Sequence, residues 1–139
     1  MANNKKWKKR WKKIVKEDFD YDYEFLIELI LHKLHLMFDY FNGVYRDFPN
    51  PDNAHILETL QEAINYGTNY LHYDYEQEST AFLNSKKLLN KNDPTLPINL
   101  NEEDSVTYRN ILLRSAKERS QDLKNFFNTI AENCEYWWD

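Results

Sequence analysis

The residues of this chain best suited to chemistry lie between positions 24 and 39, where acidic and histidine side chains recur at helical spacing. Glu24, Glu28, His32, His35 and Asp39 share one polar stripe if this segment is a helix, and Glu28 and His32 stand four residues apart. A carboxylate and an imidazole at that spacing have the right chemistry to bind one divalent metal ion. A carboxylate-bridged dimetal bundle, however, needs a Glu-x-x-His motif on each of two helices.

The second motif that a dimetal bundle requires is missing, because Glu58 is followed three residues later by Gln61 and not by histidine. Cys134 is the sole cysteine, and Glu135 and two tryptophans follow it without a nearby histidine to activate it as a nucleophile. Paired carboxylates are common in an acidic chain and identify no reaction by themselves. We therefore predict no metal, no cofactor and no enzymatic activity. The acids and histidines are interpreted as a solvated face and Cys134 as a small buried hydrophobic residue.

Composition predicts one helical domain in a reducing compartment. The 139 residues suffice for a single core, and 42% of them are hydrophobic and 16% aromatic. Glycine occurs only at Gly43 and Gly67, which argues against sandwiches, barrels and glycine-rich phosphate loops. A single cysteine permits no disulfide within the chain. No long uncharged apolar run and no secretory signal is present, so the expected location is the cytoplasm.

Charge is divided unevenly along the chain. Residues 1–16 hold eight Lys or Arg and no acid, whereas the remaining residues hold ten basic and twenty-three acidic side chains, a formal charge of −13. In the same segment Trp7, Trp11, Ile14 and Val15 stand at i, i+4, i+7 and i+8. This spacing predicts a basic amphipathic helix with one apolar stripe.

Three interpretations of this basic arm remain open. Its tryptophan stripe docks on the protein's own core, or it binds the groove of a partner protein, or the arm binds a polyanion. The polyanion would be a nucleic acid, a nucleotide or an anionic membrane. The acidic remainder of the chain would repel a polyanion, so such contact would be confined to the arm. The residues predicted to make it are Trp7, Lys8, Lys9, Arg10, Trp11, Lys12 and Lys13.

The stretch DFDYDYEF, residues 18–25, alternates acidic and aromatic residues and is followed by apolar residues at helical spacing. We predict a helix from about Tyr21 to Asn42, ended by Gly43 in a left-handed C-terminal cap. The acids would then lie at the N-terminus of this helix, where the macrodipole favours negative charge. They are Asp18, Asp20, Asp22 and Glu24.

Three further helices follow in the sequence. Asn50 and Pro51 are typical of a helix start and predict a helix to about Tyr73, with Gly67 at a kink or a close helix crossing. A short helix is predicted for residues 80–89, followed by a loop that contains Pro94 and Pro97. Asn101 begins a last helix that could reach Trp138. Its predicted apolar stripe is Ile111 or Leu112, then Ala116, Leu123, Phe127, Ile130, Cys134 and Trp137.

These elements predict an all-α fold, an antiparallel helical bundle of three long helices and one short helix. The basic amphipathic N-terminal arm spans residues 1–16, and residues 17–139 form a single helical domain.

Aromatic residues are the second set of candidates for binding a partner. In NYGTNYLHYDYE, Tyr66 and Tyr70 are predicted to be core residues, and Tyr73 and Tyr75 to be peripheral. Tyrosines flanked by acids are good anchors for a protein partner, although aromatics also fill gaps between helices. The chain ends in EYWWD, where two adjacent tryptophans point in different directions. Burying both would require neighbouring helices, a second subunit in a homo-oligomer, or a docked partner.

The entry DFDYDYEFLIELILHKLHLMFDYF together with the terminal WWD resembles a group of small, uncharacterised tailed-bacteriophage proteins. The resemblance covers about a third of the chain and does not extend to its middle. It implies a phage product that works in the bacterial host cytoplasm, and it carries no catalytic residue. By analogy with small acidic phage proteins, it suggests an inhibitor directed at the host.

The leading hypothesis is therefore a non-enzymatic binding protein that engages a host protein, such as a defence factor, through an acidic and aromatic surface. The alternatives are a polyanion-binding protein that uses the basic arm and a structural component of the virion. The residues predicted to bind the protein partner are Asp18, Asp20, Tyr21, Asp22, Tyr23, Trp137 and Trp138.

Overall fold

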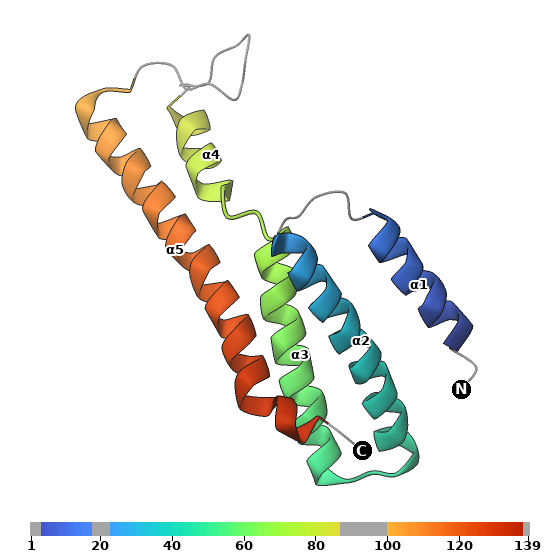
Figure 1. Cartoon of the computed structure of the whole chain (residues 1–139). Coiled ribbons are helices and arrows are strands. Elements are labelled where there is room, and N and C mark those ends of the chain that lie inside the picture. The colour runs from blue at the N-terminus through green and yellow to red at the C-terminus, as the bar shows by residue number, and fades with distance from the viewer. Residues whose placement is uncertain (1–3, 18–22, 87–99, 138–139) are drawn as a thin grey trace.

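The computed structural model describes residues 4–17, 23–86 and 100–137, and every regular element in these ranges is helical (Figure 1). The predicted all-α fold is confirmed, with the long helices packed against one another. The elements are α1 Asn4–Glu17, α2 Tyr23–Asp47, α3 Pro51–His72, α4 Gln77–Ser85 and α5 Glu102–Asn133, followed by a single 3-10 turn, η1 Cys134–Tyr136.

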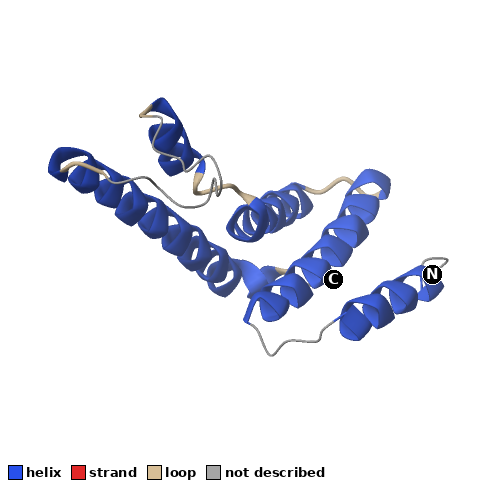
Figure 2. Ribbon diagram, turned by 90° about the horizontal axis from the view of Figure 1, so that it is seen from above, coloured by secondary structure: helices blue, strands red, loops and turns tan. Residues whose placement is uncertain are grey.

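Helix α3 is the centre of the bundle. It packs against α2 on one side and against α5 on the other, and consecutive long helices run in opposite directions (Figures 1 and 2). The short helix α4 follows α3 and packs beside the first half of α5. Helix α1 lies next to α2, on the side away from α5 (Figure 1). The basic arm is thus a helix, as predicted, at the edge of the bundle.

The ends of α3 follow from its sequence. The Asn50 side chain accepts a hydrogen bond from the Asp52 backbone N–H at 3.0 Å, and Pro51 occupies the first helical position. Both features satisfy or remove donors that have no partner inside the helix. Helix α3 ends at His72, within one residue of the predicted end.

Gly67 is the point where the three long helices come closest. A Cβ atom built on Gly67 would lie 2.7 Å from Leu31 Cδ2 of α2 and 2.7 Å from Phe126 Cε2 of α5. Phe126 is fully buried. The predicted close crossing at Gly67 is therefore confirmed, because only a residue without a side chain leaves room for both neighbours.

The predicted end of α2 is wrong. The helix continues through Gly43 to Asp47, and the Phe48 backbone N–H still donates to the Val44 carbonyl at 2.7 Å. Pro49 disfavours helical geometry at Phe48, so the proline and not the glycine ends the helix. The predicted acidic cap falls largely on residues 18–22, which lie outside the described residues. Of its members, only Glu24 is seen in the first turn.

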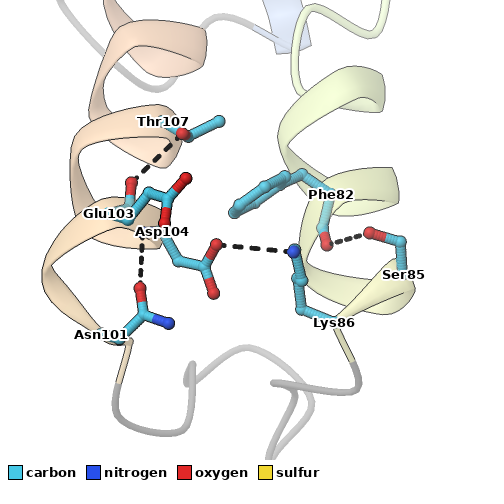
Figure 3. Close-up of polar contacts among 7 residues, drawn as sticks. All are labelled: Phe82, Ser85, Lys86, Asn101, Glu103, Asp104 and Thr107. Atoms are coloured by element: carbon cyan, nitrogen blue, oxygen red, sulfur yellow. Dashed lines mark hydrogen bonds and ion pairs between the residues drawn. The ribbon is translucent and has the colours of Figure 1, made fainter.

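The bounds of the last two helices also differ from the prediction. Helix α4 begins at Gln77 instead of Thr80, and it ends at Ser85; the loop predicted for residues 94–97 lies outside the described part. Helix α5 begins as predicted, with the Asn101 side chain accepting from the Asp104 N–H at 2.7 Å. Lys86, next to the end of α4, pairs with Asp104 of α5 at 3.5 Å (Figure 3). This ion pair connects the described residues that precede position 87 with those that follow position 99.

The predicted apolar stripe of the last helix is confirmed in part: Ile111 and Trp137 are buried and Leu123 and Ile130 pack against the core, but its other members are exposed. Phe126 is 0% exposed whereas the predicted core residue Phe127 is 40% exposed, and Ser115 is buried in place of Ala116. Cys134 is exposed, so its interpretation as a buried hydrophobic residue is wrong. The buried row is turned by about one residue, or about 100°, around the helix axis. Part of the predicted apolar stripe is consequently left at the surface.

The C-terminal end of the described chain is held by Trp137. Its indole is 6% exposed, and Nε1 donates to Thr59 Oγ1 of α3 at 2.8 Å. The helix stops at Asn133 instead of reaching Trp138, and η1 turns the chain toward α3. Trp137 is therefore buried within its own chain without a second subunit; Trp138 lies outside the described residues.

Candidate functional site

The described end of the first acidic and aromatic segment, which begins at Tyr23, meets the second segment at one end of the bundle, where α2 begins and α3 ends (Figure 1). The Tyr70 hydroxyl donates to the Tyr23 hydroxyl at 3.0 Å, across 47 positions of sequence. Tyr73 and Tyr75 stack edge to face, with ring centroids 4.9 Å apart. We call the whole group the tyrosine junction; it comprises Tyr23, Glu24, Tyr70, Tyr73, Tyr75, Glu118, Arg119 and Asp122.

Arg119 of α5 occupies the centre of the tyrosine junction and touches both of the other long helices. Its guanidinium carbon lies 4.7 Å from the centroid of the Tyr70 ring, and Nη2 lies 3.3 Å from Glu24 Oε1. A cation over an aromatic face and a carboxylate beside it are both favourable. Arg119 thus connects α2, α3 and α5 at this end of the bundle.

Two tyrosine hydroxyls of the junction, those of Tyr70 and Tyr75, are weaker acids than an ordinary tyrosine. Burial, and then the hydrogen bond with Tyr23, raise the pKa of Tyr70 to about 12. The Tyr75 hydroxyl donates to the Asp122 carboxylate, and burial followed by this bond raises the pKa of Tyr75 well above its usual value. Both phenols are neutral at physiological pH, so they act as hydrogen-bond donors and not as bases or nucleophiles.

Two hollows open beside the junction between the α3–α4 connection and α5. One has a volume of about 300 Å³ and the other about 290 Å³, and Tyr73, Tyr75 and Glu118 line both. Further carboxylates are contributed by Asp122 to the first hollow and by Asp74 and Glu78 to the second. No Lys or Arg is among the described residues that line either hollow, so both are acidic and partly aromatic.

Exposure separates the aromatic residues that can meet a partner from those that support the fold. Tyr23 is 55% exposed and Tyr73 is 54% exposed, whereas Tyr70 is buried and Tyr75 is half-buried. The predicted division of the tyrosine cluster is confirmed for Tyr70 as a core residue and for Tyr73 as a peripheral one, whereas Tyr75, predicted to be peripheral, is half-buried. Tyr66 packs against the core, also as predicted.

A ring pair connects the basic arm to the bundle. The Trp11 and His32 rings meet edge to face with centroids 4.5 Å apart, and His32 Nε2 is buried without a hydrogen-bond partner in the described part. Burial, then Arg10 and then His35, lower the pKa of His32. Every Lys and Arg side chain that the structure describes on α1 is exposed. The arm therefore rests on α2 through Trp11 and presents its cations to solvent.

The predicted partner-binding residues fall into three groups. Tyr23 lies in the tyrosine junction and is exposed, whereas Trp137 lies in the core and serves the fold. The others lie outside the described residues: Asp18, Asp20, Tyr21, Asp22 and Trp138. Of the arm residues, Lys8, Lys9, Arg10, Lys12 and Lys13 are exposed and Trp11 is half-buried, whereas the side chain of Trp7 is not described.

Three important members of the junction were missed by sequence reasoning: Glu118, Arg119 and Asp122. They lie about 45 residues beyond the tyrosines that they contact, and the sequence shows only an ordinary charged stretch of a helix. A weak signal was available. Arg119 and Asp122 stand three residues apart, so both lie on the same side of α5.

The described residues contain no group of three or more His, Cys, Asp or Glu side chains placed to hold a metal ion. In the same ranges, no helix is both long enough and apolar enough to cross a lipid bilayer. Comparison with known proteins finds no family model, no curated protein and no solved structure that matches this chain.

Proposed function

We propose that the chain is a non-enzymatic binding protein that engages a partner protein through the tyrosine junction. The observation that supports this proposal is that the Tyr23–Tyr70 hydrogen bond, across 47 positions of sequence, brings the exposed Tyr23 to the end of α3 that carries the exposed Tyr73. Exposed tyrosines provide large, stiff contact areas at little cost in side-chain entropy. The carboxylates around the two hollows favour a partner that presents Lys or Arg side chains.

The class of partner that we propose is chosen by analogy. The resemblance to small tailed-bacteriophage proteins makes a host protein the first class to test, with defence factors as the leading examples. Partner binding by an acidic surface could inhibit such a factor by covering a basic face that normally contacts another molecule. A binding role is favoured over catalysis by Tyr70 and Tyr75, whose raised pKa values keep both phenols neutral at physiological pH.

The test is an affinity capture from bacterial lysate, with nuclease present, using the full chain and two variants. Tyr73→Ala combined with Glu118→Lys changes exposed junction residues. The matched control is Tyr136→Ala. Tyr136 is also an exposed tyrosine, at 63%, but it lies in η1, after the C-terminal end of α5, and is not a member of the tyrosine junction. We expect one host protein to be captured by the parent and by Tyr136→Ala, and to be lost from the junction variant. Equal capture by all three proteins would refute the role of the junction.

A second candidate function is polyanion binding by the basic arm. It is favoured by the exposure of the described Lys and Arg side chains along α1. A phosphate-rich ligand would bind with a strong dependence on salt concentration. In Lys8→Glu combined with Lys12→Glu, the affinity for a short duplex DNA should fall and its dependence on salt should weaken. Unchanged binding and an unchanged salt slope would contradict this candidate.

A further inference from the structure

Helix α5 has an apolar row on its outer face in addition to the row that it buries. Val106 is 44% exposed, Leu113 is 63% exposed and Phe127 is 40% exposed, and these residues stand at i, i+7 and i+21. Ser120 completes the seven-residue spacing and is also exposed. The four positions span about 31 Å along the helix. A seven-residue repeat of this length is the pattern by which one helix packs along another.

The described helices leave this row uncovered. Figures 1 and 2 show α5 at one edge of the bundle, with α3 and α4 both on its inner side. The buried residues of α5, such as Ile111 and Phe126, face that inner side. At about 100° per residue, Val106, five residues before Ile111, and Leu113, two residues after it, both lie roughly on the opposite side of the helix from Ile111.

The charges of α5 are sorted between its two sides. Glu118 and Asp122 line the hollows of the tyrosine junction, on the side of α3 and α4. Lys117 and Lys124 are exposed beside the outer row, and neither forms an ion pair among the described residues. Arg109, also exposed, lies in the same row one turn beyond Val106. The outer row thus has three apolar residues and Ser120, with Arg109 in line with it and Lys117 and Lys124 along one flank.

From this arrangement we infer that the outer face of α5, lined by Val106, Leu113, Ser120 and Phe127 and flanked by Lys117 and Lys124, docks an amphipathic helix of a partner protein that carries carboxylates beside its apolar row. Apolar residues at heptad spacing select a helix, and the lysines at the flanking positions select acidic neighbours. This surface is distinct from the tyrosine junction, which attracts basic groups. The two surfaces fit partners of opposite charge.

A second copy of this chain is a poor occupant. Two copies of the outer face packed antiparallel would place the Lys117 and Lys124 of one copy beside the same lysines of the other. Packed parallel, each lysine would face the opposite side of the row, where Leu112 is exposed, Arg119 and Phe126 are turned toward the bundle, and no carboxylate is present. Like charges at these positions oppose pairing, whereas glutamates on a different helix would favour it.

The experiment measures binding of two labelled four-heptad peptides to the full chain by fluorescence anisotropy. Both peptides carry leucine at the inner heptad positions; one has glutamate at the flanking positions and the other has lysine. We expect the glutamate peptide to bind about tenfold more tightly than the lysine peptide, as two flanking ion pairs would provide. Lys117→Glu combined with Lys124→Glu should reverse this preference, and Leu113→Gln should weaken both peptides.

A matched control separates the outer face from the basic arm, which would also attract an acidic peptide. Lys8→Glu combined with Lys12→Glu makes the same change of charge on α1, and binding of the glutamate peptide should survive it. Loss of binding in this arm variant, with binding retained in the α5 variants, would overturn the proposal. So would equal affinity for the two peptides, self-association of the chain that Leu113→Gln abolishes, or α5-dependent binding to vesicles of anionic lipid in place of the peptide.

Discussion

Adding one methyl group at each of the two glycines should change stability in opposite directions. Both glycines lie inside helices, Gly43 in α2 and Gly67 in α3. Alanine is favoured over glycine in a helix interior by about 1 kcal/mol. At Gly43 nothing lies within 4 Å of an added Cβ, so the Gly43→Ala variant should be stabilised by about 0.5–1 kcal/mol.

At Gly67 the same gain is opposed by overpacking. The added Cβ would meet Leu31 Cδ2 at 2.7 Å and two atoms of the Phe126 ring at 2.7 and 2.9 Å, all closer than the 3.0 Å that real Cβ contacts respect. The buried Phe126 ring and the Leu31 methyl must both move, and an overfilled core costs about 1–3 kcal/mol. The gain is common to both variants, so we expect them to differ by the overpacking cost, about 1–3 kcal/mol, and Gly67→Ala to lower the free energy of unfolding by up to about 2 kcal/mol.

Urea unfolding followed by circular dichroism measures both free energies, provided that the slope with urea concentration is unchanged. Phe126→Leu gives an internal check because it removes part of the ring that meets the new methyl. It should cost less stability in the Gly67→Ala background than in the parent, as expected for two residues in contact. A Gly67→Ala protein as stable as Gly43→Ala, or additive effects of Gly67→Ala and Phe126→Leu, would refute the close packing described at this crossing.

Three other outcomes are expected. Trp137→Phe keeps an aromatic ring but removes the indole donor to Thr59, so the free energy of unfolding should fall by about 1–2 kcal/mol in the same urea assay. Tyr70 has its pKa raised to about 12, so the stability that its neutral form provides is complete below pH 10 and is lost as the pH rises through about 12; ultraviolet titration should show this ionisation, and Tyr70→Phe should remove it. The pKa of His32 is lowered by burial and by Arg10 and His35, so its ring contact with Trp11 should be complete above pH 6.5 and weaken as the pH falls below that value. Tryptophan fluorescence should follow this loss of contact, and His32→Gln should abolish the pH dependence.

Local features of the sequence predicted the helices well where their ends carry a strong chemical signal. Asn50 with Pro51 placed the start of α3, and Asn101 placed the start of α5. Gly43 misled, since a glycine permits a helix end without requiring one, whereas Pro49 forces it. Short-range rules therefore located the two starts that carry an asparagine cap, whereas they misplaced the uncapped start of α4 and the end of α2.

The tyrosine junction shows what sequence periodicity does not contain. The alternation of acids and aromatics around Tyr23 and around Tyr73 was visible, but their meeting depends on the antiparallel packing of α2 and α3. Arg119 belongs to the site because α5 packs where its guanidinium contacts both Glu24 of α2 and Tyr70 of α3. Contacts between distant residues of this kind follow from the packing of whole helices, which one sequence without relatives does not determine.

The two apolar rows of α5 also could not be ranked from the sequence, because both keep helical spacing. Shape decides between them. Gly67 leaves a notch on α3 that admits the Phe126 ring together with Leu31 of α2, and no polar group has to be buried to fill it. Once Phe126 enters the notch, Phe127 is carried about 100° around the helix toward solvent, and Leu113 follows on the same side. The absence of a side chain at Gly67 therefore determines both the row of α5 that closes the core and the row that is left for another protein.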